Sequence, residues 1–326
     1  MVRAACGTIF TGAVARVEHQ GRLVYERAYG RTRDDVLARP VYRDTLFDLA
    51  SITKIFVATR ALELVQRGVL TLDGLLVRWI PEWANTDHEP ITLRMLLAHI
   101  SGMNSGADYR QLLGTNVVEF AIARDLVQAP GESVIYSDLG FIALGALLER
   151  IEGIALQQMI PGYLPRSRQR PAIPATEDDG WRGRVQGFVH DEKAFLMGGT
   201  AGHAGIFGTA ADVAALGERY LATFHGRQTT LDPDMVRAAT SEQADDAVLR
   251  RGLGWALKTS NENSCGRWFS KNSFGHTGFV GTCIWVDPER DVSAVLLTNS
   301  VYYGRNDTRD LRAAFYEAVV DDLGLR

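Results

Sequence analysis

The chain has 326 residues, of which 46% are hydrophobic, and this is enough to bury a sizeable core without a structural metal or a disulfide framework. Its 35 basic and 39 acidic residues leave a formal net charge of -4, so we expect no strong electrostatic field and no binding to nucleic acid. The three cysteines, Cys6, Cys265 and Cys283, form neither a CxxC pair nor a zinc-like spacing and are expected to be reduced thiols. A small neutral or anionic ligand is compatible with this composition.

The first residues lack the continuous apolar stretch of a secretion signal, because Gly7 and Gly12 interrupt it. Nowhere does the sequence reach the roughly 18 consecutive apolar residues of a membrane span. The most apolar window covers residues 139–148. We therefore expect a cytoplasmic protein with no membrane span, although a periplasmic or extracellular chain whose leader had been removed would look the same.

Two β-rich segments open the chain, at residues 13–17 and 22–28, and His19-Gln20-Gly21 between them predicts a hairpin turn. From residue 52 the apolar residues take helical spacing as far as Gly68, where a helix would stop. A second helical pattern covers residues 141–151 and ends at Gly153.

A stretch rich in proline and arginine at residues 161–174 predicts an exposed connection. β character then returns: residues 252–257, 278–286 and 292–297 predict strands, with a turn at 287–290 between the last two, and residues 311–320 predict a closing helix. Strands at both ends around a mostly helical middle predict an α+β fold with one sheet completed by the two terminal segments.

Ser51-Ile52-Thr53-Lys54 is a Ser-x-x-Lys motif at the start of the first predicted helix. Residues three apart lie on one helical face, so the amine of Lys54 can reach the hydroxyl of Ser51 and activate it as a nucleophile. The free N–H groups at a helix N-terminus favour the negative charge that develops during attack. To act as a base Lys54 would have to lose its proton, which burial and a neighbouring positive charge can bring about.

An ordinary explanation of the same residues is a serine N-cap followed by a solvated lysine, so the context has to decide. The chain has four lysines, and only Lys54 has a serine three positions earlier. Tyr136-Ser137-Asp138 lies at the start of the second predicted helix, where the Tyr136 phenol could pass a proton to a leaving group or act as the base. The alternative is a core tyrosine beside a turn aspartate.

His276-Thr277-Gly278 lies at the end of a candidate strand that the backbone of Phe279 continues. A glycine there lets a substrate lie close to the strand edge, and the N–H of Phe279 can complete an oxyanion hole with the N–H of Ser51. A histidine in a strand is otherwise more often a structural hydrogen-bond donor than a catalyst.

In this order the three motifs resemble the Ser-x-x-Lys, Tyr-x-Asn and Lys-Thr-Gly set of β-lactamases and penicillin-binding proteins. Longer segments also resemble the class C β-lactamase family, at residues 46–50, 70–73, 91–102 and 202–209. That family of penicillin-binding protein-like serine hydrolases also contains D-alanyl-D-alanine carboxypeptidases, D-aminopeptidases and carboxylesterases.

The resemblance implies an antiparallel sheet flanked by helices beside a mostly helical lobe, with the active site in the cleft between them. We expect one catalytic unit over residues 1–326, with a sheet lobe of about residues 1–48 and 245–326 and a helical lobe of about residues 49–244. It also implies a set of site residues: Ser51, Lys54, Tyr136 and His276 as the catalytic group, the N–H groups of Ser51 and Phe279 as the oxyanion hole, and Asp138, Thr277 and Gly278 along the substrate groove. No metal or organic cofactor is implied.

Two departures from the family pattern bear on the substrate. Asp138 stands where the family often has asparagine, and a carboxylate suits a substrate N–H or a cation better than a carbonyl. His276 replaces the lysine of Lys-Thr-Gly with a ring that is mostly neutral at pH 7. We therefore expect an esterase or D-amino-acid-type peptidase acting on a small ester, amide or peptide. The alternatives are a true β-lactamase, a transacylase, and a non-turnover β-lactam-binding sensor.

Other classes of enzyme lack their motifs. The chain has no Gly-x-Ser-x-Gly elbow, and its glycine-rich residues 198–208 contain no Gly-x-Gly-x-x-Gly. His190-Asp191 and His203 could suggest metal ligands, but their spacing matches no metal motif. We expect these residues to belong to a loop that shapes the cleft.

Overall fold

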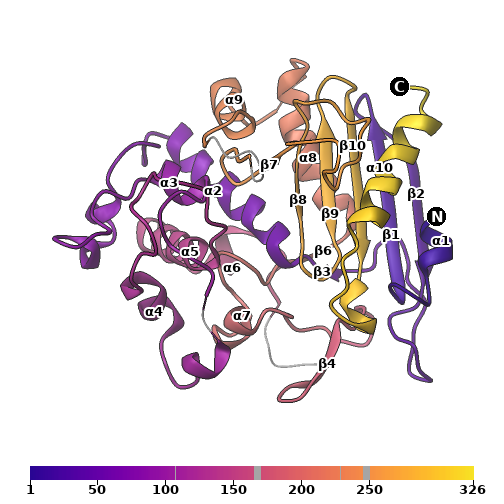
Figure 1. Cartoon of the computed structure of the whole chain (residues 1–326), viewed down its shortest axis with the longest axis horizontal. Helices are drawn as coiled ribbons and strands as arrows, with labels where there is room; N and C mark the ends of the chain where they lie inside the picture. The colour runs from indigo at the N-terminus through magenta and orange to yellow at the C-terminus, as the bar shows by residue number, and fades with distance from the viewer. Residues whose placement is uncertain (107, 165–169, 228, 245–249) are drawn as a thin grey trace.

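The computed structural model describes residues 1–106, 108–164, 170–227, 229–244 and 250–326. Figure 1 shows a sheet with its covering helices on one side of the molecule and a largely helical region beside it. This architecture confirms the predicted α+β class. No helix of the described residues is long and apolar enough to cross a bilayer.

One six-stranded antiparallel sheet is built from the two ends of the chain, as the sequence predicted. In spatial order its strands are β2 (Arg22–Gly30), β1 (Gly12–His19), β10 (Val292–Thr298), β9 (Cys283–Asp287), β8 (Phe274–Thr277) and β7 (Ala256–Leu257). Because β1 pairs with β10, the N-terminal hairpin and the C-terminal strands form one continuous sheet. The predicted hairpin at the start of the chain is confirmed.

Two predicted strands are too long. The strand predicted at 278–286 begins only at Cys283, because residues 278–282 form the turn from β8 into β9. In that turn the N–H of Gly278 donates to the carbonyl of Thr282 at 2.7 Å, and Gly281 has a φ of 112°, which L side chains rarely adopt. The strand predicted at 252–257 is reduced to its last two residues.

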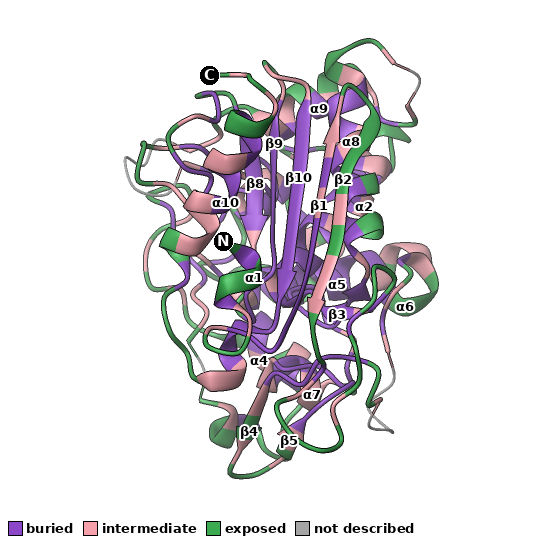
Figure 2. Ribbon diagram, turned by 90° about the vertical axis from the view of Figure 1, so that its right-hand side faces the viewer, coloured by how far each residue is buried: buried purple, intermediate pink, exposed green. Residues whose placement is uncertain are grey.

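Alternate residues of the central strands face two different hydrophobic cores, as expected for a sheet covered on both faces. On β10, Ala294 and Leu296 join the core shared with α10 (Arg309–Asp322), whereas Val295 and Leu297 join the core shared with α8 (Ala210–Phe224). Figure 1 shows α10 in front of the sheet and α8 behind it, and Figure 2 shows that β10 is buried along its whole length.

The helical region lies beside the β8 side of the sheet (Figure 1). Its α-helices are α2 (Thr53–Gln66), α3 (Leu93–Leu97), α4 (Val117–Ala123), α5 (Asp138–Glu152), α6 (Leu156–Met159), α7 (Glu192–Leu196) and α9 (Pro233–Thr240). A short helix α1 (Val2–Ala5) precedes the sheet. Both helices that the sequence predicted here are present, as α2 and α5.

The predicted helical lobe at 49–244 contains more than helices. Its helix α8 packs on strands β1, β9 and β10 of the sheet. This lobe also contains strands of two small antiparallel pairs. In one, β3 (Phe47–Asp48) pairs with β6 (Phe207–Gly208), and in the other, β4 (Glu177–Asp179) pairs with β5 (Gly183–Val185). Of the connection predicted at 161–174, residues 165–169 lie outside the described residues.

Candidate active site

Ser51 lies in a single 3-10 turn, Ala50–Ile52, that leads directly into α2. The buried carboxyl of Asp48 holds this turn, because one oxygen accepts from the N–H of Ala50 at 2.8 Å and the other from the N–H of His190 at 2.6 Å. Ala50 has a φ of 46°, a left-handed conformation that is costly for a residue with a side chain. Burial raises the pKa of Asp48 to about 6, although these hydrogen bonds favour its charged form.

Lys54 is completely buried, and its amine has three acceptors. Nζ lies 3.1 Å from Ser51 Oγ, 2.8 Å from Asp138 Oδ1 and 3.3 Å from the carbonyl of His203. Burial lowers the pKa of Lys54, but Asp138 and Tyr136 together, through their charges and hydrogen bonds, hold this pKa above its ordinary value. The sequence analysis required a neighbouring positive charge to lower the pKa of Lys54. This requirement is not met, because the nearest charged group is the carboxylate of Asp138. Lys54 is therefore an ammonium group that donates to the hydroxyl of Ser51.

The Tyr136 ring lies between the Ser–Lys pair and strand β8. The amine of Lys54 is 4.7 Å from the centroid of this ring, and the guanidinium of Arg251 is 5.3 Å from it. The ring centroids of His99 and His276 lie at 4.6 Å and 6.2 Å. Two cations and two imidazoles thus surround the phenol, and the three motifs found in the sequence meet at Tyr136.

His276 is a buried, neutral residue of β8. Its Nδ1 donates to the carbonyl of Thr277 at 2.9 Å, which leaves the lone pair on Nε2. Burial lowers the pKa of His276 to about 3, and the positive charges of Arg251 and Lys54 act in the same direction. A neutral ring at pH 7 agrees with the expectation from the sequence.

Gly278 brings the end of β8 against the segment that carries Ser51. A Cβ at this position would lie 2.5 Å from the carbonyl oxygen of Leu49, so only glycine allows this approach. Thr282 Oγ1 donates to the same carbonyl at 3.1 Å, and Val280 packs against Ala50. The β8–β9 turn, which includes Phe279, is therefore fixed next to the backbone of Ser51.

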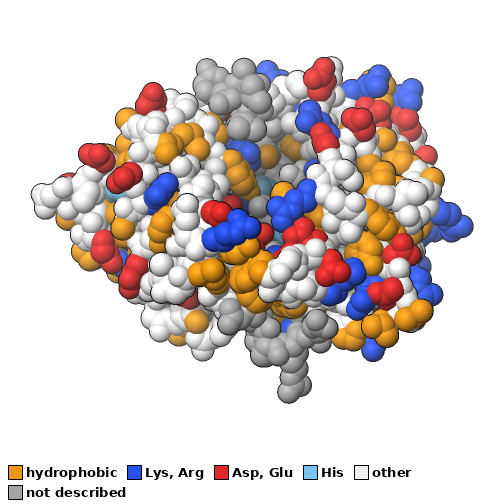
Figure 3. Space-filling view, turned by 60° about the horizontal axis from the view of Figure 1, so that its bottom comes forward, with side chains coloured by type: hydrophobic (Ala, Val, Ile, Leu, Met, Phe, Trp, Pro, Cys, Tyr) orange, Lys and Arg blue, Asp and Glu red, His pale blue; other side chains and the backbone are white. Residues whose placement is uncertain are grey.

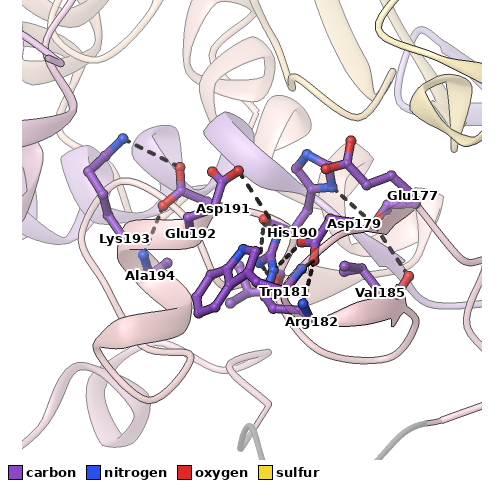
Figure 4. A network of polar contacts seen from close by, with 12 residues as sticks. Glu177, Asp179, Trp181, Arg182, Val185, His190, Asp191, Glu192, Lys193 and Ala194 are labelled. Atoms are coloured by element: carbon purple, nitrogen blue, oxygen red, sulfur yellow. Dashed lines mark hydrogen bonds and ion pairs between the residues drawn. The ribbon is translucent and has the colours of Figure 1, made fainter. Parts of the chain in front are cut away.

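A second buried lysine completes the charge distribution around Lys54. Lys193, from α7, lies 3.2 Å from Asp138 Oδ2, so both carboxylate oxygens of Asp138 are in contact with lysines. Burial by itself would raise the pKa of Asp138, but Lys54, His203 and Lys193 lower it to about 2. Lys193 also lies 3.7 Å from Asp191, as Figure 4 shows, and Asp191 accepts from His203 Nε2 at 2.7 Å.

Asp138, Asp191 and His203 are close enough together to be considered as metal ligands, since their ligand atoms lie within 4.8 Å of one another. Their sequence spacing gave no sign of this, because they come from the start of α5, the residue before α7 and the loop after α7. The ammonium groups of Lys54 and Lys193 already contact Asp138 and would repel a metal cation. The cluster therefore fits two lysines better than a metal.

The predicted residues Ser51, Lys54, Tyr136 and His276 lie close together in the structure. The sequence analysis missed their neighbours Lys193, Arg251 and His99. A signal for Lys193 was present, because a buried carboxylate at position 138 needs a cation, and the chain has only four lysines. His99 holds the backbone after Tyr136, since its Nδ1 accepts from the N–H of the next residue at 3.0 Å.

A cavity of about 590 Å³ opens beside these residues, within the size range of small-molecule sites. Its wall includes Tyr136, Arg251, His276 and Thr277. A further hollow of about 360 Å³ continues past Thr277, along Gly278 and Phe279. Figure 3 shows a hollow in this face of the molecule, with basic, acidic and apolar side chains around it.

The chain has the β-lactamase fold, and its family is one of serine hydrolases. The chain belongs to the Beta-lactamase family, whose family model matches residues 7–318.

Two curated relatives span most of this chain. A protein named "Putative D-alanyl-D-alanine carboxypeptidase" from Escherichia coli (strain K12) is 29% identical over 331 residues, which cover 85% of this chain and 76% of that protein. A protein named "N-acetylmuramyl-L-alanine amidase" from Bacillus subtilis (strain 168) is 29% identical over 342 residues, covering 89% and 77%. Among solved structures, "EstCE1, a hydrolase with promiscuous acyltransferase activity" is similar, with a TM-score of 0.78, 22% identity, and coverage of 97% of this chain and 96% of that one.

Proposed function

We propose that this protein hydrolyses its substrate through a covalent acyl-enzyme at Ser51, acting as an esterase or a D-amino-acid-type peptidase. One observation carries the proposal: the buried ammonium of Lys54 lies 3.1 Å from Ser51 Oγ. Burying a lysine charge is costly unless the charge is paired, and Lys54 is paired with Asp138. This ion pair holds the Lys54 ammonium next to the hydroxyl of Ser51.

In the first half-reaction Ser51 Oγ attacks the substrate carbonyl and loses its proton. A Lys54 ammonium has no lone pair, so we assign the role of base to Tyr136, whose ring lies 4.7 Å from the Lys54 amine. In this role Tyr136 starts as a phenolate, whose negative charge the nearby cations Lys54 and Arg251 offset, and it becomes a neutral phenol when it takes the serine proton.

The tetrahedral intermediate then collapses to the acyl-enzyme. We assign the N–H groups of Ser51 and Phe279 to its oxyanion, because the close approach at Gly278 fixes the β8–β9 turn against the nucleophile segment. Tyr136 returns its proton to the leaving alcohol or amine. Water attacks the ester of Ser51 in the second half-reaction, releasing the acid and restoring the serine.

The substrate class follows from the groups that line the cavity. Thr277 and Gly278 lie along the groove, and the neutral His276 supplies no permanent cation where the family pattern has lysine. In this proposal Asp138 positions Lys54 and does not touch substrate, because its two oxygens contact lysines of the chain. The names of the curated relatives support peptide or amide substrates, and that of the solved structure supports an acyl-transferring hydrolase.

The test is a panel of p-nitrophenyl esters, D-amino-acid amides and nitrocefin, assayed with the parent protein and with Ser51→Ala. We expect turnover of esters or D-amino-acid amides that Ser51→Ala abolishes. The control Ser133→Ala removes an exposed hydroxyl and should leave the rates unchanged. Turnover that survives in Ser51→Ala would show that another residue is the nucleophile.

The same panel separates the alternatives. A β-lactamase would turn over nitrocefin faster than the esters and amides. A sensor would give one-to-one adducts at Ser51 without turnover, and a transacylase would form product only when a small alcohol acceptor is supplied.

A further inference from the structure

We propose that Lys193 is a positioning residue of the acylation step: its ammonium balances the second oxygen of Asp138 and thereby keeps Lys54 directed at Ser51. The inference rests on the proposed function and deepens it. Lys193 lies outside the three sequence motifs, and it acts on the chemistry through Asp138.

The first observation is a closed ring of contacts. Lys54 contacts Asp138 at 2.8 Å, and Asp138 contacts Lys193 at 3.2 Å. Lys193 contacts Asp191 at 3.7 Å, and Asp191 accepts from His203 at 2.7 Å. The carbonyl of His203 then accepts from Lys54 at 3.3 Å, which closes the ring. The side chains of Lys54, Asp138, Lys193 and Asp191 are thus each held from two sides. A change at Lys193 is therefore transmitted to Lys54 through Asp138.

The second observation is the charge balance of this buried cluster. Lys54 and Lys193 are cations, and Asp138 and Asp191 are anions whose pKa values lie below the ordinary range despite burial. The titratable groups near them include Tyr136 and His203, and also His276, His99 and Asp48. A carboxylate at position 138, where the family often has a neutral amide, adds one negative charge next to the nucleophile. Lys193 supplies the matching positive charge, since an uncompensated buried charge is strongly unfavourable.

The direction of the effect follows from this balance. Without Lys193, one oxygen of Asp138 loses its cation and the pKa of Asp138 rises, because a nearby opposite charge favours the ionised form. Protonated Asp138 no longer fixes the Lys54 ammonium. Lys193 acts on Lys54 through Asp138, so the loss should fall on the rate of acylation and not on substrate binding.

The experiment measures the single-turnover rate of Ser51 acylation by a p-nitrophenyl ester between pH 4 and 9. For Lys193→Met we expect a rate at least about 10-fold lower than in the parent and KM within about twofold. We also expect a loss of activity toward pH 4 that the parent does not show, because the parent's Asp138, with a pKa of about 2, stays ionised across the whole range. Lys193→Arg should retain more activity than Lys193→Met, because it keeps the cation. Lys271→Met, which removes an exposed lysine, is the matched control.

A charge-balance cycle provides a second test that does not depend on the folding of Lys193→Met. Asp138→Asn leaves Lys54 and Lys193 facing each other without an anion between them, whereas Asp138→Asn combined with Lys193→Met restores a balanced cluster. We expect the double variant to acylate faster than Asp138→Asn. A double variant no faster than Asp138→Asn overturns the inference, as does a folded Lys193→Met with the rate and the pH profile of the parent. If the parent itself is not acylated at Ser51, the proposed function fails instead.

Discussion

The approach of β8 to the nucleophile segment can be tested by replacing Gly278 with alanine. The new Cβ would lie 2.5 Å from the carbonyl oxygen of Leu49, which is a backbone atom that cannot rotate away. Restoring ordinary van der Waals contact requires the strand end and the nucleophile segment to separate by about 1 Å, and a misplacement of this size costs about 100-fold in rate. We therefore expect Gly278→Ala to lower kcat/KM for a p-nitrophenyl ester about 100-fold.

The assay compares initial rates of ester hydrolysis with the thermal unfolding midpoint of each variant. Gly180→Ala is the control, because a Cβ at that exposed glycine meets nothing within 4 Å. A Gly278→Ala protein that keeps more than half of the parent's kcat/KM would refute the reasoning, since the oxyanion hole could then not depend on this approach.

Three further predictions follow from individual side chains. Tyr136→Phe should lower kcat about 10²- to 10⁴-fold with little change in KM, as steady-state kinetics on an ester will show. Asp48 has a folded-state pKa of about 6 against an ordinary 3.8, so its contribution to stability is present below about pH 4 and lost as the pH rises through about 6. Urea unfolding should show a loss of about 3 kcal/mol over that window in the parent, and Asp48→Asn should lack it. Asn299→Ala should destabilise the fold by about 3 kcal/mol in urea, because buried Asn299 hydrogen-bonds Thr11, Gly12 and Ala175.

The parts of the fold that the sequence predicted are those where local pattern and tertiary packing agree. The N-terminal hairpin consists of two β-rich segments joined at His19-Gln20-Gly21, and α5 begins at the cap that Ser137 provides to Gly140 at 2.8 Å. The Ser-x-x-Lys pair is also a local feature, since one helical turn is enough to bring Lys54 to Ser51.

The remaining features depend on contacts between distant segments. The apolar residue Val280 suggests a strand, but it lies in a turn because it packs on Ala50 and the backbone reverses at Gly281. Lys193 is 139 positions from Lys54, and only the tertiary fold places both on Asp138. Spacing rules look for ligands that are close in sequence, so they cannot find a cluster of this kind.

The most direct test of the account is to identify the acylated residue. The parent protein is mixed with p-nitrophenyl acetate, quenched in acid within the first turnover, digested and analysed by mass spectrometry. The account predicts one acetyl group on the peptide that contains Ser51, and none on the corresponding peptide of Ser51→Ala. An acetyl group on a different residue, formed at the rate of turnover, would contradict it.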